Sequence, residues 1–238
     1  MQRFFIDPAF IQGDKVLILD ADVVHQMTRV LRMSVGDEVL FLDITGFSYT
    51  ATLQEIAKKS LTFLVTKKEA LTDQSGAVIE LFQALPKKPE TFELIVQKGT
   101  ELGVHAFTPI TTDFCNRREL HKVDRVERII TEAAEQSERG TKPALRPVTD
   151  FEKALTENKE HALVLHSRDT TEQMVKYVQT NKTQKRFCIF IGPEGGFSQK
   201  EIAFVQSLNV PILGLGSNIL RTETAAIVAC GVVGLMKN

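Results

Sequence analysis

The sequence has few cysteines, no long apolar run and almost no net charge, and each absence excludes a class of protein. Its three cysteines, Cys115, Cys188 and Cys230, lie far apart and match no metal-binding spacing, so we expect no metal site. No apolar stretch is long enough to span a membrane, and the N-terminus lacks the apolar core of a secretory signal peptide. These absences predict a cytoplasmic protein whose thiols stay reduced and buried.

The near-neutral charge argues against a partner that is bound through overall attraction. The chain carries 29 Lys and Arg against 30 Asp and Glu, which gives a formal net charge of -1. A neutral protein can still present a local basic face to nucleic acid, so only global steering is excluded. The chain is 43% hydrophobic and 25% charged, which is typical of a globular protein with an apolar core.

The residue pattern of the sequence changes near residues 70–77, and this change divides the 238 residues into two parts. The first part has β-branched or aromatic runs separated by turn signals, at residues 3–6, 15–19, 39–44, 50–55 and 60–66. One helix is expected after Asp20 or Asp22, with a shared face made of Val23, Met27, Val30, Leu31 and Ser34. Five strands and one helix predict a small β-barrel, and residues 71–76 are typical of a linker.

The second part alternates segments typical of strands with segments typical of helices. Strands are expected at residues 77–85, 104–110, 162–166, 187–191 and 210–215. Helices are expected between them, with an apolar stripe at Phe92, Ile95, Val96 and Gly99, capping boxes at Asp124 with Glu127 and at Ser198 with Glu201, and a last helix at residues 222–236. This alternation predicts an α/β domain whose largely parallel sheet is buried on both faces.

The first glycine segment, Ile191-Gly-Pro-Glu-Gly-Gly-Phe197, follows an apolar strand and precedes a capped helix. Glycine lets a backbone turn sharply and approach a ligand, and ligands of α/β sheets bind beyond the carboxyl ends of strands. No Gly-Lys-Ser/Thr follows, so the segment is not a Walker loop. It is either a ligand loop or a tight strand-to-helix connection, and its three glycines favour the ligand loop.

The second glycine segment, residues 213–225, reads Leu-Gly-Leu-Gly-Ser-Asn-Ile-Leu-Arg-Thr-Glu-Thr-Ala. A dinucleotide fingerprint would need a third glycine where Ile219 stands, and a βαβ unit that the remaining chain is too short to form. The segment instead presents Asn218, Arg221, Thr222 and Glu223 before a helix. Two interpretations remain: a polar grip on a ligand, or a helix capped by Thr222 with solvated charges beside it.

These segments, taken together, resemble those of a known family. The resemblance also rests on Arg3-Phe-Phe, His25, Val30-Leu-Arg-Met with Gly36-Asp37, Lys98-Gly-Thr-Glu-Leu-Gly-Val104, and Glu132-Ala-Ala-Glu-Gln-Ser137 with Arg139. In this order over essentially the whole chain, the motifs resemble the RsmE family, the 16S ribosomal RNA (uracil1498-N3)-methyltransferases of the SPOUT superfamily.

The resemblance implies a fold and a cofactor. Residues 1–72 would form a PUA-like, RNA-binding β-barrel, and residues 73–238 a SPOUT α/β domain tied in a trefoil knot. The knot loops would bind S-adenosylmethionine in a homodimer whose active sites lie at the subunit interface. The expected cofactor-binding residues are Leu165, His166, Ile191, Gly192, Pro193, Glu194, Gly195, Gly196, Leu213, Gly214, Leu215, Gly216, Asn218, Ile219, Leu220 and Thr222.

The resemblance also implies a reaction on the small ribosomal subunit. Arg221 is the first candidate to stabilise the uracil anion, with Glu223 or Glu194 orienting it or assisting proton removal. RNA contacts are expected from basic side chains, namely Arg3, Arg29, Arg32, Arg117, Arg118 and Arg139. Two alternatives stay open: a ribose 2′-O-methyltransferase of the same superfamily, and an RNA-binding protein that has the fold but no activity.

Overall fold

The computed structural model describes residues 1–43, 45–71, 76–167, 170 and 172–237. By their internal contacts the residues form two units. The first comprises Met1–Asp73 and Ala134–Lys142, and the second comprises Gln74–Ala133 and Pro143–Asn238. Within the described residues, no helix is both long enough and apolar enough to cross a membrane.

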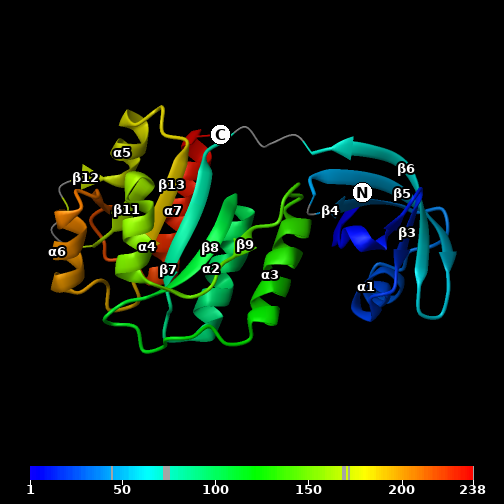
Figure 1. The fold of residues 1–238 in the computed structure, drawn as a ribbon, viewed down its shortest axis with the longest axis horizontal. Coiled ribbons are helices and arrows are strands. Elements are labelled where there is room, and N and C mark those ends of the chain that lie inside the picture. The colour runs from blue at the N-terminus through cyan, green and yellow to red at the C-terminus, as the bar shows by residue number, and fades with distance from the viewer. Residues whose placement is uncertain (44, 72–75, 168–169, 171, 238) are drawn as a thin grey trace. The chain divides into compact units, whose positions relative to one another are not determined.

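The first unit contains a six-stranded sheet in the order β1-β4-β5-β6-β3-β2. Figure 1 labels β3, β4, β5 and β6 of this sheet. Neighbouring strands are antiparallel except β1 and β4, which are parallel. The strands are β1 (Gln2–Ile6), β2 (Ile11–Gln12), β3 (Lys15–Ile18), β4 (Glu38–Asp43), β5 (Phe47–Ile56) and β6 (Leu61–Ala70). The five predicted strands are confirmed. The pairings among described residues run from β1 to β2 without joining these two, so they form an open sheet rather than a closed barrel.

The predicted helix of the first unit is present but changes its winding. Asp20 caps α1 (Ala21–His25), because its carboxylate accepts hydrogen bonds from the backbone of Asp22 and Val23. The chain continues as a π-type turn, η2 (Gln26–Val30). A π-type turn has more residues per turn than an α-helix, which rotates the predicted apolar face. Met27 is fully buried, but Val30 is 66% exposed, so the prediction that Val30 shares the buried face is wrong.

The second segment of the first unit, residues 134–142, stabilises the first strand. The Phe5 N–H donates to the Glu135 carboxylate at 2.9 Å. The Arg3 guanidinium donates to the Glu138 carbonyl at 2.8 Å and forms an ion pair with the Glu138 carboxylate at 3.0 Å. Strand β1 is therefore tied to a stretch of chain more than a hundred residues away.

The second unit is built on one parallel sheet in the order β10-β8-β7-β13-β11-β14-β12, with β9 beside β8. Every pairing of described residues in this sheet is parallel, as predicted. The strands are β7 (Val78–Ala84), β8 (Val104–Thr111), β9 (Ala144–Leu145), β10 (Thr149–Asp150), β11 (Ala162–Leu165), β12 (Glu172–Gln173), β13 (Arg186–Ile191) and β14 (Ile212–Gly214). Their carboxyl ends therefore all lie at one edge.

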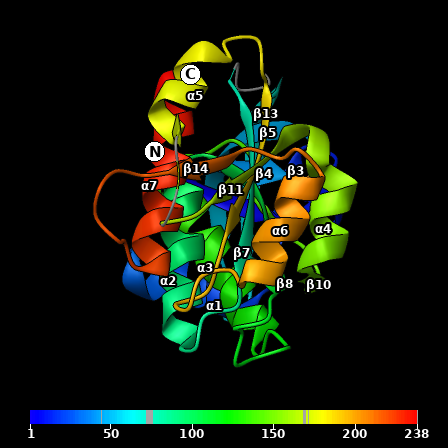
Figure 2. The same ribbon diagram turned by 90° about the vertical axis from the view of Figure 1, so that its left-hand side faces the viewer.

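Helices cover both faces of this sheet, as Figure 2 shows. One layer contains α2 (Pro89–Glu101), α3 (Val123–Gln136), α5 (Met174–Thr180) and α7 (Thr222–Lys237), and the other contains α4 (Phe151–Asn158) and α6 (Gln199–Ser207). Along β13 the side chains alternate between two cores, with Ile189 and Ile191 in the first and Cys188 and Phe190 in the second. The strand is apolar on both faces because both faces are covered.

Capping residues and apolar spacing in the sequence predict most of these helices, but not all of them. Ser198 and Glu201 form the predicted capping box of α6. Helix α3 begins at Val123, so Asp124 lies inside its first turn and is not the cap that the sequence predicts. Helix α4 was not predicted. It has only eight residues, and its N-cap Asp150 accepts a hydrogen bond from the Lys153 backbone at 3.2 Å.

The three thiols are buried, as predicted. Burial raises the pKa of Cys230 to about 12. Burial, and then the nearby Glu80 carboxylate, raise the pKa of Cys188 to about 12 as well. Both side chains therefore stay protonated and unreactive, because the thiolate is the nucleophilic form.

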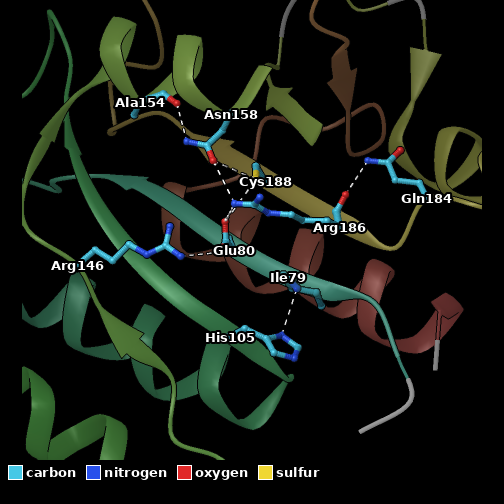
Figure 3. Close-up of polar contacts among 9 residues, drawn as sticks. All are labelled: Ile79, Glu80, His105, Arg146, Ala154, Asn158, Gln184, Arg186 and Cys188. Carbon is cyan, nitrogen blue, oxygen red and sulfur yellow. Dashed lines mark hydrogen bonds and ion pairs between the residues drawn. The ribbon is translucent and has the colours of Figure 1, made fainter. Parts of the chain in front are cut away.

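An ion cluster built on the buried Glu80 lies at the amino ends of β7 and β13, at the opposite edge of the sheet from the carboxyl ends (Figure 3). The Glu80 side chain is 8% exposed and accepts from Arg146 at 2.6 Å and from Arg186 at 2.7 Å, one arginine on each oxygen. Arg186 also donates to Asn158 Oδ1 at 3.3 Å. Burial alone would raise the pKa of Glu80, but the hydrogen bonds from Arg186 and Arg146 outweigh it and hold this pKa below its usual value.

Replacing Glu80 should destabilise the second unit. Glu80→Gln leaves two arginines facing a neutral amide, and we expect the free energy of unfolding to fall by about 1.5–3 kcal/mol. Because folding lowers the pKa of Glu80 below 4.5, its contribution is complete above about pH 4.5 and is lost as the pH falls through the lowered pKa. Urea unfolding of both proteins at pH 7 and near pH 3 measures this difference.

The matched control is Glu93→Gln. Both Glu93 oxygens accept hydrogen bonds from a single guanidinium, from Nε and Nη2 of Arg125, but the Arg125 side chain is 61% exposed. Exposed ion pairs contribute little, so this variant should unfold at nearly the wild-type urea concentration. The assignment would be contradicted if both variants lost the same free energy of unfolding. It would also be contradicted if the stability difference between Glu80→Gln and the wild type were as large at pH 3 as at pH 7.

Candidate functional site

A pocket of about 1220 Å³ lies where three parallel strands of the second unit end. The chain enters it after β11 through Leu165 and His166, after β13 through the first glycine segment, and after β14 through the second glycine segment. Parallel sheets bind ligands at this edge, since the loops that leave the strands converge there. The two segments that the sequence singles out thus share one pocket.

The pocket brings together nearly all the predicted site residues. It is lined by every residue expected for the cofactor and for catalysis except Leu213 and Gly214. Leu213 is fully buried in the core of the sheet. Gly214 is covered by other side chains: a Cβ there would lie 2.6 Å from Thr170 Oγ1. That the lining residues bind a cofactor is a prediction from the sequence.

The first glycine segment folds back on itself. A Cβ on Gly192 would lie 3.0 Å from the Gly196 carbonyl carbon, closer than almost any real Cβ contact. The Gly196 N–H donates to the Pro193 carbonyl at 2.9 Å, and Gly196 has a φ of 72°, which glycine adopts without strain. This geometry accounts for glycine at both ends of the loop, and it leaves the loop backbone close to the pocket.

A chain of buried hydrogen bonds joins the two glycine segments. The Thr222 hydroxyl donates to the Gly192 carbonyl at 2.6 Å and accepts from Gln83 Nε2 at 2.9 Å. Gln83 also donates to the Ala84 carbonyl at 2.9 Å, and both Gln83 and Thr222 are buried. The interpretation of Thr222 as a simple helix cap is therefore wrong, because its hydroxyl bonds to the other segment instead.

The Glu194 carboxylate is held at the rim of the pocket. Both of its oxygens accept from the Lys87 N–H, at 3.0 and 3.2 Å. Lys87 follows β7, so this contact fixes the first glycine segment to the neighbouring strand end. Glu194 thus has a positioning role in addition to its charge.

The second glycine segment lines the pocket from Leu215 onward. The Gly216 N–H donates to Gln173 Oε1 at 2.7 Å, which anchors the start of the segment. The Arg221 carbonyl accepts from the Ala225 N–H at 2.8 Å and so begins α7. Arg221 and Glu223, on either side of the anchored Thr222, both line the pocket. A cation and a carboxylate are thereby held close to the same space.

Several lining residues were missed by the analysis of the sequence. They include Thr91, Asp113, Phe114, Gln199 and Lys200. Asp113 and Phe114 follow β8, and only the strand order shows that this loop reaches the first glycine segment. The one available signal was the rule that loops after parallel strands gather at one edge.

The predicted RNA-binding arginines differ in exposure. Arg29, Arg32 and Arg118 are exposed, whereas Arg3 is paired with Glu138. Arg117 is partly buried. Arg139 is 5% exposed, and burial lowers its pKa to about 10, so its side chain is not presented to solvent. Among the described residues, no group of His, Cys, Asp or Glu is arranged to hold a metal ion.

Known protein families match both parts of the chain. Residues 73–234 match the family described as an RNA methyltransferase domain, and residues 13–66 match an RNA methyltransferase PUA domain. The first match covers well over half of the chain. Together the two matches extend over the pocket and over strands β3, β4, β5 and part of β6 of the first unit.

Individual relatives match over nearly the whole length of this chain. Ribosomal RNA small subunit methyltransferase E of Rickettsia conorii is 28% identical over 98% of this chain and 95% of that protein. The protein of that name from Synechocystis sp. is 32% identical over 95% of this chain and 75% of that protein. These matches confirm the resemblance inferred from the motifs.

Solved structures of other proteins also match this chain over nearly its whole length. The ribosomal RNA small subunit methyltransferase E of Neisseria gonorrhoeae, bound to S-adenosyl methionine, has a TM-score of 0.86 and 25% identity over 99% of this chain and 98% of that one. A Legionella pneumophila protein solved in complex with the same cofactor has a TM-score of 0.86 and 28% identity over 98% of this chain and 96% of that one.

Removing the Thr222 hydroxyl should loosen the pocket. Thr222→Val keeps the shape of the side chain but leaves the Gly192 carbonyl and Gln83 Nε2 without this partner. We expect a loss of about 1–3 kcal/mol of stability and faster amide exchange in residues 192–197. The measurements are urea unfolding and hydrogen–deuterium exchange. Thr224→Val, at an exposed position on the same helix, is the control and should change neither the stability nor the amide exchange. If amide exchange in residues 192–197 is unchanged in Thr222→Val, Thr222 does not link the two segments.

Proposed function

Because the chain belongs to the RNA methyltransferase family, we propose that it transfers the methyl group of S-adenosylmethionine to N3 of uridine 1498 in the 16S rRNA of the small ribosomal subunit. The observation that carries this proposal is the pocket formed by the two glycine segments, in a chain that matches such enzymes from end to end. A cytoplasmic site of action follows from the substrate, since ribosomal subunits are cytoplasmic.

The residues of the pocket fit S-adenosylmethionine. Its volume of about 1220 Å³ is ample for a nucleoside with an amino-acid tail. The close approach of Gly192 to Gly196 leaves backbone groups available to a ligand without an intervening Cβ. We assign the binding residues to Leu165, His166, residues 191–196 and the lining residues of the segment 215–222.

The cofactor supplies a methyl group on a positively charged sulfur, so the protein has no need to activate the donor. The chain must instead align uracil N3 with the methyl carbon and favour the N3 anion. We assign Arg221 to the uracil carbonyl that gains negative charge, and Glu223 to the N3 proton. The N3 electron pair forms the new bond to carbon, and the carbon–sulfur pair leaves with sulfur. Glu194 holds the loop through the Lys87 amide.

The RNA is assigned to both parts of the chain. We propose residues 1–72 as a PUA-like RNA-binding domain and residues 73–238 as the catalytic domain, supported by the family matches at 13–66 and 73–234. The exposed Arg29, Arg32 and Arg118 are retained as phosphate contacts, together with Arg117 and Arg3. Arg139 is not retained, because its side chain is buried.

The outer face of α7 supports a homodimer. The helix has no charged residue between Glu223 and Lys237, and Val228, Leu235 and Met236 are exposed on it, Leu235 by 85%. A helix that is apolar all round belongs in an interior. We propose that this face meets a second copy of the chain.

We also propose that the second unit is knotted. Strand β13 lies between β7 and β11, whereas the next strand, β14, lies on the far side of β11. Helix α7 then returns across the sheet to pack on β7 and β13. The chain thus passes beyond β11 to form β14 and then comes back to β7 and β13, as it would if its end were threaded through an earlier loop. Such a knot would be an exception, because protein chains usually avoid them.

Arg221→Ala should abolish most turnover but spare the cofactor. We expect kcat to fall by about 100-fold or more, as for other lost contacts to a developing anion, while the Kd for S-adenosylmethionine changes little. Turnover is measured on small subunits that lack the modification, and Kd by calorimetry. Arg128→Ala, at an exposed position of α3 outside the pocket lining, serves as the control with near-normal kcat. A fully active Arg221→Ala would remove Arg221 from the mechanism.

The function itself is tested by locating the modified atom. After reaction with unmethylated small subunits, nucleoside mass spectrometry should find 3-methyluridine at position 1498. Methylation of a ribose 2′-oxygen would indicate the other enzyme class. Absence of both product and S-adenosylhomocysteine binding would indicate an RNA-binding protein without activity.

The dimer is tested by charging its proposed interface. Leu235→Glu would bury a carboxylate against an apolar partner surface, so we expect light scattering to give a monomer mass, against twice that mass for the wild type. Ile56→Glu, at a 43%-exposed apolar position of the first unit, is the control and should remain dimeric. A monomeric wild type would refute the interface.

A further inference from the structure

Phe114 is exposed, which sets it apart from every other aromatic residue of this protein. The chain has 15 Phe, 2 Tyr and no Trp, all within the described residues. The other sixteen rings are buried or half-buried, whereas Phe114 is 53% exposed. Exposing a phenylalanine to water sacrifices part of the roughly 1.5–3 kcal/mol that burial provides. A function at this position would explain the exposure.

The backbone around Phe114 is firmly held. The preceding Asp113 donates its N–H to Glu201 at 2.9 Å and accepts from the Ser198 hydroxyl at 2.6 Å. The following Cys115 is buried, and its N–H donates to the Thr112 carbonyl at 3.1 Å. An exposed ring on an anchored backbone is preorganised for contact, since little freedom is lost when a ligand binds.

Phe114 lies against the first glycine segment and lines the pocket. A Cβ on Gly195 would be 3.1 Å from the Phe114 Cβ and 3.3 Å from Cδ2, so the absence of a side chain at Gly195 makes room for the ring. The pocket, at about 1220 Å³, also exceeds the roughly 300–1,000 Å³ typical of small-molecule sites. It has room for a second planar group beside a cofactor.

We propose that Phe114 is the surface on which the target nucleobase stacks when it leaves the RNA and enters the pocket. The inference rests on the proposed function, because it assumes that the substrate is a base. An enzyme that acts on a ring nitrogen must separate the base from its neighbours, and an aromatic side chain replaces the stacking that is lost. The Asp113 carboxylate is occupied by Ser198, so Phe114 offers its ring surface, not a polar contact.

Phe114→Leu tests the role of the ring, because leucine keeps apolar bulk without an aromatic face. We expect kcat/KM for unmethylated small subunits to fall by about 10-fold or more, in line with the stacking energy of one base. The Kd for S-adenosylmethionine should stay at the wild-type value. Phe114→Trp should recover most of the activity. Leu94→Ala, at an exposed apolar position of α2 outside the pocket lining, is the control.

A second readout does not depend on turnover. RNA that carries 5-bromouridine at the target position is bound to the protein and irradiated, and mass spectrometry locates the crosslinked residue. Crosslinking at Phe114 in the wild type, and its loss in Phe114→Leu, support the stacking contact even if no methyl group is transferred. Failure of methylation alone would thus count against the proposed function and not against the inference.

Three results would overturn the inference. Unchanged kcat/KM in Phe114→Leu would show that the ring does not meet the substrate. A parallel loss of S-adenosylmethionine affinity would place the ring in the cofactor site, and a shift to monomer in light scattering would place it in the subunit interface. A Phe114→Leu protein that is inactive and also unfolded by circular dichroism leaves the decision to Phe114→Trp and to the crosslink.

Discussion

One buried hydroxyl, that of Thr222, determines how the pocket is assembled. It connects the end of β7, the loop after β13 and the start of α7, three segments that are far apart in the sequence. Because donor and acceptor are both away from water, the geometry is specific: a displaced loop would leave polar groups unpaired inside the protein. The positions of Arg221 and Glu223 follow from this one contact, since each is the immediate neighbour of the anchored residue.

The two ends of the strands in the parallel sheet carry different kinds of residues. At the amino ends, the buried Glu80 carboxylate pairs with the guanidinium groups of Arg146 and Arg186, which are partly exposed. At the carboxyl ends the strands continue into the two glycine segments, which line the pocket. The ion cluster and the pocket thus lie at opposite ends of the same strands, while the Thr222 contacts stabilise the pocket end.

Much of this arrangement could be predicted from the sequence, for identifiable reasons. Apolar runs such as the one ending at Ile191 and the capping box of Ser198 with Glu201 are local signals, and both were confirmed. The winding change after His25 was not predictable from apolar spacing, which assumes one helical period. The Thr222 linkage and the place of Phe114 depend on strand order, which spacing along the chain does not contain. Arg139 was misjudged because an arginine motif carries no information on burial.

The strand β1 is completed by residues that come much later in the chain. Glu135 and Glu138 bind Phe5 and Arg3, and residues 74–133 separate this segment from the rest of the first unit. During synthesis at about 5–20 residues per second, those 60 residues take roughly 3–12 s to emerge. Strand β1 can pair with β4 before then, but the Phe5 N–H and the Arg3 guanidinium have to wait for Glu135 and Glu138 and stay hydrated until those residues are made. Folding of the first unit is in this sense paced by translation of the second.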